Sequence, residues 1–282
     1  MRTKNVNFKA VILVIVLFVI SGITAYKFLG PGAEDIIKSK KFMEKLYSIN
    51  AVNTDIDLSD IKYEKVKSGN NKTELTYSTV VTQYYGIDLD KENDVIGFAK
   101  KDTQPNVTKI GVDEAESLAE KYLNNIYDGD ILLKNVKNEE DLPYYSFIFT
   151  KEKYGYPFYF DEIKVNINKE DGFLDGYSNM AIRTSEKEPI INISEDEAKE
   201  TALSMFESYN GEGTISENVQ LVYSANKIEK TSDNVEELCY MITIDGKDSD
   251  GNIISWKIFI NADDNTVFNI LKNGAEKEVK TT

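Results

Sequence analysis

The chain has 282 residues, a formal net charge of −15 at pH 7, no histidine and one cysteine. The lack of histidine excludes Ser-His-Asp and Cys-His catalysis and histidine-ligated zinc, and a single cysteine excludes internal disulfides and cysteine-based metal clusters. Carboxylate chemistry and oxygen-ligated cations remain open, whereas the acidic balance disfavours nucleic acid and anionic lipid as partners.

The N-terminal segment has the pattern of a membrane anchor. An uncharged apolar run, Ala10–Tyr26, lies between Lys9 and Lys27, and residues 1–30 contain no acidic side chain. The run is at the short end for a membrane-spanning helix, and its flanking lysines can lengthen the span. We expect a cytoplasmic N-terminus, a single pass of the cell membrane and an extracytoplasmic bulk. A cleaved signal peptide is the alternative, but Ile23-Thr24-Ala25 is a poor cleavage site.

Three amphipathic segments predict helices further along the chain. The first is Ala33–Tyr47, the second follows Gly111 with Asp113 and Glu116 as a capping box, and the third starts with the capping box of Ser194 and Glu197. Helical spacing predicts that the following apolar side chains are buried: Ile36, Ile37, Met43, Leu46 and Tyr47; Ala115, Leu118, Ala119, Tyr122, Leu123 and Ile126; Ala198, Ala202, Leu203, Met205 and Phe206.

Three alternating segments share one pattern and predict repeated hairpins. In each, a strand ends at Asp90, Asn168 or Asn261, an acidic or amide-rich corner follows, and a second apolar strand begins. Asn, Asp and Gly favour such corners because they tolerate left-handed dihedrals and bond their own backbone. We therefore interpret the acids of these corners as structural. The segments are Tyr85–Lys100, Ile163–Ser178 and Trp256–Leu271.

Helices that alternate with hairpins predict an α+β fold, in which repeated units each pack one helix on an antiparallel sheet. Pro105 and Pro189 lie in polar stretches that mark boundaries between units. The predicted organisation is a cytoplasmic tip and transmembrane anchor at 1–30, a first and divergent unit at 31–105, a second unit at 106–188, a third at 189–274 and a polar tail at 275–282.

The sequence assigns no catalytic, cofactor-binding or metal-binding residue. The densest group of oxygen ligands, Asp245–Asn252, does not fit the EF-hand pattern and is interpreted as a hairpin loop, with cation binding left open. Cys239 lies in an alternating segment and is predicted to be a buried small hydrophobe rather than a nucleophile.

Aromatic side chains crowd the segment from Tyr144 to Phe160. A sheet core needs one alternating face of them, and core packing is the simplest interpretation. Within the segment, Tyr154-Gly155-Tyr156-Pro157 is predicted to form a loop, and binding residues favour loops on rigid sheets. The candidate partner contact is therefore Tyr154, Tyr156, Pro157 and Phe158.

In its helix and hairpin motifs the chain resembles the PepSY-type modules of bacterial envelope proteins, over roughly residues 110–272. Ile193–Ala198 matches their helix motif, and Val165–Asn168 with Gly172 matches their hairpin motif, as does Ile258–Asn261. Asn265 and Asp94 stand in the other two corners where that motif has glycine. The central stretch is similar to YcdB/YcdC-repeat proteins, with Gly155, Pro157 and Phe158 matched and Lys151 near the position of their arginine.

A competing resemblance is to membrane-anchored accessory proteins of sensor kinases, the YycH/YycI type. Both resemblances imply a binding or regulatory module without a cofactor and not an enzyme. The first implies a partner in the cell envelope, such as a protease or wall hydrolase, that is inhibited, localised or stabilised. The second implies regulation of a cell-wall-sensing histidine kinase. A carboxylate-dependent glycan hydrolase is the third hypothesis, and it requires two acids that face each other across a groove.

Overall fold

The computed structural model describes residues 32–53, 62–68, 75–101, 107–179, 185–225 and 235–274. Within these residues, three helices and a large, mainly antiparallel sheet confirm the predicted α+β class. The predicted anchor at residues 1–30 lies outside the described residues. Within the described ranges, no helix is both long and apolar enough to cross a membrane.

The chain divides into two compact units that are interleaved in sequence. Unit 1 comprises Met1–Tyr127, Lys137–Ser146 and Val165–Asn179, and unit 2 comprises Asp128–Val136, Phe147–Lys164 and Met180–Thr282. Three strands contribute residues to both units: β5 (Asp130–Lys137), β6 (Tyr144–Lys153) and β7 (Tyr156–Asn168).

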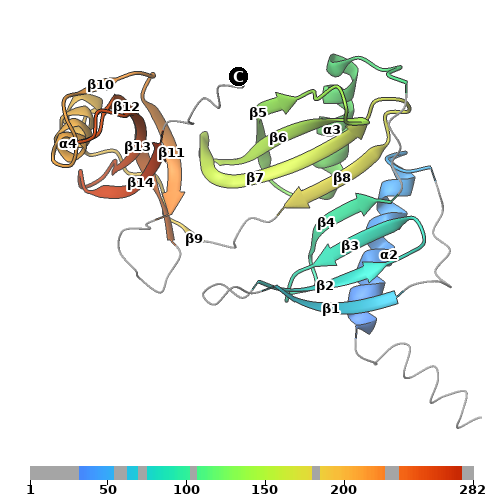
Figure 1. Ribbon diagram of the computed structural model, residues 1–282. Coiled ribbons are helices and arrows are strands. Elements are labelled where there is room, and N and C mark those ends of the chain that lie inside the picture. Colours follow the sequence, from blue (N-terminus) through green and yellow to red (C-terminus); the bar gives the residue numbers. More distant parts are fainter. Residues whose placement is uncertain are drawn as a thin grey trace, which may run out of the picture. The chain divides into compact units, whose positions relative to one another are not determined.

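Unit 1 contains an antiparallel meander in the order β1-β2-β3-β4, and β8 adds to β4 (Figure 1). Helix α2 packs on this sheet through Met43 and Leu46, which are buried, and through the Phe42 ring, 6.1 Å from Phe98. The predicted face is partly wrong, because Ile37 and Tyr47 are exposed. The elements are α2 (Ala33–Ser48), β1 (Lys62–Ser68), β2 (Leu75–Val81), β3 (Tyr85–Leu89), β4 (Val95–Lys100) and β8 (Leu174–Asn179).

Helix α3 (Val112–Ile126) also belongs to unit 1 and starts earlier than its predicted cap. Its N-cap is Gly111, without a side-chain hydrogen bond, so the predicted capping box at Asp113 is wrong. The start is fixed by the preceding backbone instead, because Lys109 and Ile110 both donate to the carbonyl of Lys169. The predicted face holds at its centre, where four side chains are buried: Ala115, Ala119, Tyr122 and Leu123.

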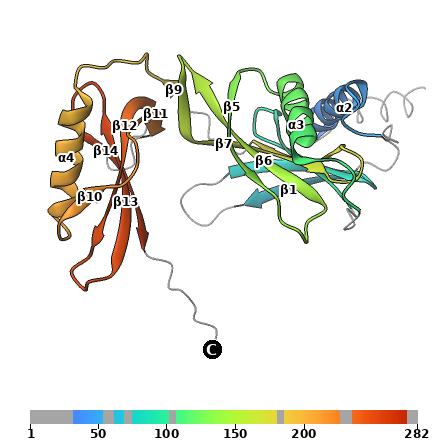
Figure 2. The same cartoon turned by 90° about the horizontal axis from the view of Figure 1, so that it is seen from above.

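Unit 2 contains the antiparallel strands β11-β12-β13-β14 with helix α4 along one face (Figures 1 and 2). The predicted capping box of Ser194 and Glu197 is confirmed, and Phe206 is buried between helix and sheet. A Cβ at Gly213 or Gly246 would lie within 3 Å of the Phe206 ring, so both glycines make room for it. The elements are β9 (Ser185–Glu186), α4 (Glu195–Glu207), β10 (Gly213–Ile215), β11 (Gln220–Ala225), β12 (Val235–Lys247), β13 (Ile253–Asn261) and β14 (Val267–Gly274).

The predicted hairpin corners are present between β3 and β4, β7 and β8, and β13 and β14. In each, the side-chain oxygen of Asp90, Asn168 or Asn261 accepts the backbone N–H two residues later, at 3.0, 2.8 and 2.8 Å. The first corner is one residue shorter, so its left-handed position is Asn93 and not Asp94. The left-handed residues are Asn93, Gly172 and Asn265.

Candidate functional site

The predicted contact residues lie on the hairpin of β6 and β7 in unit 2. Lys153 ends β6 and Tyr156 begins β7, so the turn has two residues, Tyr154 and Gly155. The predicted loop from Tyr154 to Pro157 is too long, because Tyr156 and Pro157 already belong to β7. Positive φ at both turn residues, 56° and 81°, is typical of the tight turns whose twist matches that of the strands.

Tyr154 occupies a backbone conformation that its side chain disfavours. Asparagine and glycine are the usual residues at positive φ in such turns, and a bulky side chain there costs about 1 kcal/mol. The Tyr154 side chain is nevertheless 48% exposed at the end of the hairpin. Strain of this kind at an exposed aromatic residue is a reason to look for a function of the ring.

The end of the hairpin packs against Tyr223 of β11. The Phe158 ring stacks on the Tyr223 ring at 4.7 Å and 14°, and the Tyr154 ring lies 6.5 Å from the same ring. Phe158 is 6% exposed, so it supports the hairpin end and contributes little surface itself. Tyr156 is half-buried against the core under α4. Of the predicted contact residues, Tyr154 therefore offers the most accessible ring.

Charged groups border the Tyr154 ring. Lys153 forms an ion pair with Glu186 of β9, and its ammonium group lies 5.3 Å from the centre of the Tyr154 ring. The Tyr223 hydroxyl donates a 2.8 Å hydrogen bond to the carbonyl of Lys187. Burial, followed by nearby Tyr154 and Glu186, raises the pKa of Tyr223 to about 12. Tyr223 therefore stays a neutral donor near neutral pH and fixes the hairpin to the segment after β9.

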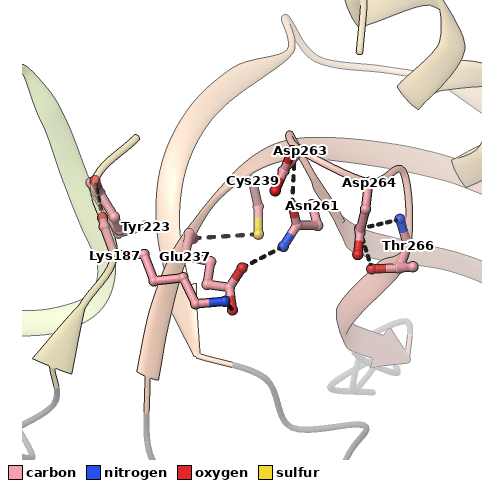
Figure 3. Close-up of polar contacts among 8 residues, drawn as sticks. All are labelled: Lys187, Tyr223, Glu237, Cys239, Asn261, Asp263, Asp264 and Thr266. Carbon is pink, nitrogen blue, oxygen red and sulfur yellow. Dashed lines mark hydrogen bonds and ion pairs between the residues drawn. The ribbon is translucent and has the colours of Figure 1, made fainter. Parts of the chain in front are cut away.

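Figure 3 shows how this segment connects to the third hairpin corner. The Lys187 ammonium lies 2.5 Å from the Glu237 carboxylate, and the Asn261 side-chain amide donates to the same carboxylate at 2.9 Å. Asn261 in turn accepts the N–H of Asp263 in the corner. Polar contacts thus run without interruption from Tyr223 to the β13–β14 corner, and such connected networks favour a single arrangement of their members.

Cys239 lies beside this network and is fully buried, as predicted. Its thiol donates to the carbonyl of Glu237 at 3.5 Å (Figure 3). Burial, reinforced by the nearby carboxylate of Glu237, raises the pKa of the Cys239 thiol well above its ordinary value. A buried neutral thiol is a weak nucleophile, so the group contributes packing rather than reactivity.

The acids of the described residues mostly have structural partners. Asp248, in the predicted loop Asp245–Asn252, accepts the backbone N–H groups of Asp250 and Asn252 and closes the β12–β13 hairpin. Hydrogen bonds, first those with Asn252, hold the pKa of Asp248 below its ordinary range. In the described part of the chain, no group of three or more Cys, Asp or Glu side chains is placed to hold a metal ion.

Two buried carboxylates are neutralised by lysines within their own units. In unit 2, the Asp161 carboxylate lies 3.1 Å from the ammonium of Lys151, the residue near the expected arginine of the YcdB/YcdC motif. In unit 1, Asp175 lies 3.6 Å from Lys100 and accepts a hydrogen bond from Asn168 at 2.8 Å. Each acid therefore faces a lysine.

Several residues of the site were missing from the sequence interpretation. Tyr223, Glu186 and Lys187 meet the hairpin end only because β11 lies beside β7 at Tyr223 and Phe158. The segment Gln220–Ala225 alternates like a strand, but its neighbour cannot be read from the alternation.

Comparison with known families agrees with the resemblance to YcdB/YcdC-repeat proteins noted in the sequence. The family model of the YcdB, YcdC repeated domain matches residues 39–181, which run from α2 through β8. The solved structure of the Bacillus megaterium YpeB C-terminal domain is similar at 20% identity and a TM-score of 0.48, covering 84% of this chain and 96% of that one. No curated protein matches the sequence.

Proposed function

This chain belongs to the YcdB, YcdC repeated domain family, and we propose that it is a non-catalytic, extracytoplasmic protein-interaction module anchored in the cell membrane. In this proposal it binds a cell-envelope protein, such as a protease or wall hydrolase, and inhibits, localises or stabilises it. The absence of histidine from the sequence and the burial of its one cysteine support a role without nucleophilic catalysis.

The observation that carries the proposal is the strained and exposed Tyr154. A turn that needed only to reverse the chain would be more stable with asparagine at this position. The tyrosine instead places a ring at the end of a hairpin, where a partner can reach it. Tyrosine is enriched in protein interfaces because it offers a large contact area with little side-chain entropy to lose.

The surroundings of Tyr154 favour a preformed contact. Phe158 and Tyr223 stack beneath the hairpin end, and Lys153 is held by Glu186. A ring that is already fixed loses less freedom when a partner binds, so more of the contact energy becomes affinity. The acidic balance of the chain, with a net charge of −15, favours a partner whose facing surface is basic.

The test separates folding from binding at Tyr154. In the Tyr154→Asn variant, we expect the free energy of unfolding to be unchanged or up to about 1 kcal/mol higher, because asparagine tolerates the left-handed backbone. Affinity capture from solubilised envelopes should recover one dominant protein with the unmodified chain and lose most of it with the variant.

The matched control is Tyr84→Asn, since Tyr84 is 51% exposed but lies in unit 1 before β3. It should retain the captured protein. Recovery of the same protein by the unmodified chain and by both variants would remove Tyr154 from the contact. Failure to recover any dominant protein would overturn the proposal itself.

A further inference from the structure

We propose that strand β5 is a self-association edge, along which two copies of this chain pair as antiparallel strands about a two-fold axis at Leu132. Among the described strands, β5 pairs with β6 alone, and Figure 1 shows it at the margin of its group of strands. The backbone groups on its other side are thus available for a further strand. This inference does not depend on the proposed function of Tyr154.

The side chains of β5 are incompletely covered. None of its eight residues is buried, although the strand contains the consecutive apolar residues Ile131, Leu132 and Leu133. Leu132 is 46% exposed, whereas Ile131 and Leu133 are half-buried on the opposite face. An exposed edge strand of this length without proline or glycine is a template for pairing unless it is protected.

Symmetry restricts how two copies of β5 can pair. A two-fold axis perpendicular to the sheet keeps each face on its own side. The axis must therefore pass midway between a residue and its own copy on the facing strand. With the axis at Leu132, Asp130 of each copy lies opposite Lys134 of the other. Ile131 then lies opposite Leu133. Every directly opposite pair within Asp130–Lys134 is thus apolar or oppositely charged.

Neighbouring registers are less favourable. With the axis at Leu133, Lys134 lies opposite Leu132 and Asp130 opposite Val136, so the charge pairs are lost. With the axis at Lys134, two ammonium groups face each other directly, which is destabilising. The charges of β5 therefore select the register in which the exposed Leu132 meets its own copy.

Lys134 is placed so that its ammonium group can pair with Asp130 of a second copy. Its ammonium group donates to Glu162 at 2.7 Å and to the carbonyl of Tyr159 at 3.3 Å. An ammonium group has three donors, so one N–H remains for the Asp130 carboxylate of a second copy. That carboxylate makes no side-chain hydrogen bond or ion pair to the parts of this chain that the structure describes.

The first test is a Leu132→Cys crosslink in the full-length chain in detergent. Opposite residues of antiparallel strands have Cα atoms about 4.5–5.5 Å apart, within the range that a disulfide bridges. Mild oxidation should therefore give a covalent dimer. The matched control is Ile191→Cys in unit 2, where the native side chain is 47% exposed. Native Cys239 is buried and should not react. Crosslinking of Leu132→Cys no faster than that of the control would overturn the proposal.

The second test uses charge. Asp130→Lys should weaken self-association roughly tenfold, as measured by sedimentation, because two symmetry-related attractive pairs become repulsive. Lys134→Asp should weaken it similarly, with circular dichroism to verify folding. An equimolar mixture of the two variants should associate again, since it brings a basic strand to an acidic strand. A chain that is monomeric without substitutions, or a mixture that stays monomeric, would overturn the proposal.

Discussion

Two helix-and-hairpin segments of this chain, residues 107–179 and 189–274, lie within the predicted second and third units, and they share a backbone frame but differ in the side chains around it. In the second, Lys109 and Ile110 donate to the carbonyl that follows the corner asparagine, and in the third Asn192 and Ile193 do the same. A tyrosine hydroxyl also donates to the carbonyl of the residue before each N-cap, from Tyr145 to Ile110 at 3.1 Å and from Tyr240 to Ile193 at 3.0 Å.

The differences lie at the corner itself. The left-handed residue is Gly172 in the second repeat and Asn265 in the third. The corner asparagine donates to Asp175 of β8 in one repeat and to Glu237 of β12 in the other. Backbone bonds thus define the repeat, whereas the acid and the turn residue vary with local packing. Three comparisons between the repeats can test this division.

The largest difference should appear at the left-handed residue. A Cβ at Gly172 would lie 2.8 Å from Leu118 of α3, in addition to the cost of a left-handed alanine. We expect Gly172→Ala to lower the free energy of unfolding by about 3 kcal/mol, which combines backbone strain with overpacking. Chemical denaturation of the full-length chain measures this change.

The matched substitution is Asn265→Ala, which adds no clash of this kind. It should cost about 1 kcal/mol or less, because only the left-handed preference of asparagine is lost. Equal losses for the two substitutions would mean that Leu118 moves aside and that contact with α3 does not dictate the glycine.

The tyrosine bonds should show an intermediate and equal effect. Tyr145→Phe and Tyr240→Phe each leave a carbonyl before the helix without its hydroxyl partner. We expect each to cost about 1 kcal/mol in denaturation experiments. Tyr85→Phe is the control, because Tyr85 is buried in β3 and its hydroxyl makes no such bond within the described ranges. If the losses at Tyr145 and Tyr240 differ by several-fold, the two bonds are not equivalent.

The smallest effect should be the pH dependence of Asp175. Burial raises the pKa of Asp175 above its ordinary value of 3.8, against hydrogen bonding from Asn168 and the charge of Lys100. Below 3.8 the carboxyl is neutral in both states, and as pH rises through the folded-state pKa the buried group ionises and stability falls. The stability of Asp175→Asn relative to the unmodified chain should therefore increase as pH rises above 3.8.

Asp248→Asn provides the opposite sign. Hydrogen bonds lower the pKa of Asp248, so its contribution to stability is present at neutral pH and is lost as pH falls through the lowered pKa. The advantage of the unmodified chain over Asp248→Asn should thus shrink in acid. A constant stability difference across pH for Asp175→Asn would show that its burial is offset by Asn168 and Lys100.

Local signals predicted the elements of this fold well. The Ser194–Glu197 capping box and the Asx corners depend on neighbours within a few residues, and both formed as predicted. The Asp113 cap failed because a distant carbonyl, that of Lys169, sets the start of α3. The motifs placed the family resemblance at roughly residues 110–272, whereas the family model covers residues 39–181, because α2 and the meander carry no motif as distinctive as the later repeats.

The candidate site was less predictable because it depends on contacts between residues that are far apart in the sequence. Tyr154 could be found from its aromatic and glycine-containing surroundings. The strain of its left-handed backbone could not, because it arises from a two-residue turn where a longer loop was predicted. Tyr223 supports it from more than sixty residues away through a single bridge between β7 and β11. Interactions set by strand neighbours leave no local pattern in the sequence.

The interleaving of the two units has a consequence for how the chain can be made and divided. Unit 1 needs residues up to Asn179, while unit 2 already uses Asp128–Val136 and Phe147–Lys164. As the polypeptide emerges from the ribosome, the first unit therefore cannot finish folding before two segments of the second have been synthesised. No single cut yields both units as intact fragments. A truncation after β8 would leave Phe147–Lys164 of the β6–β7 hairpin without the rest of unit 2, Met180–Thr282.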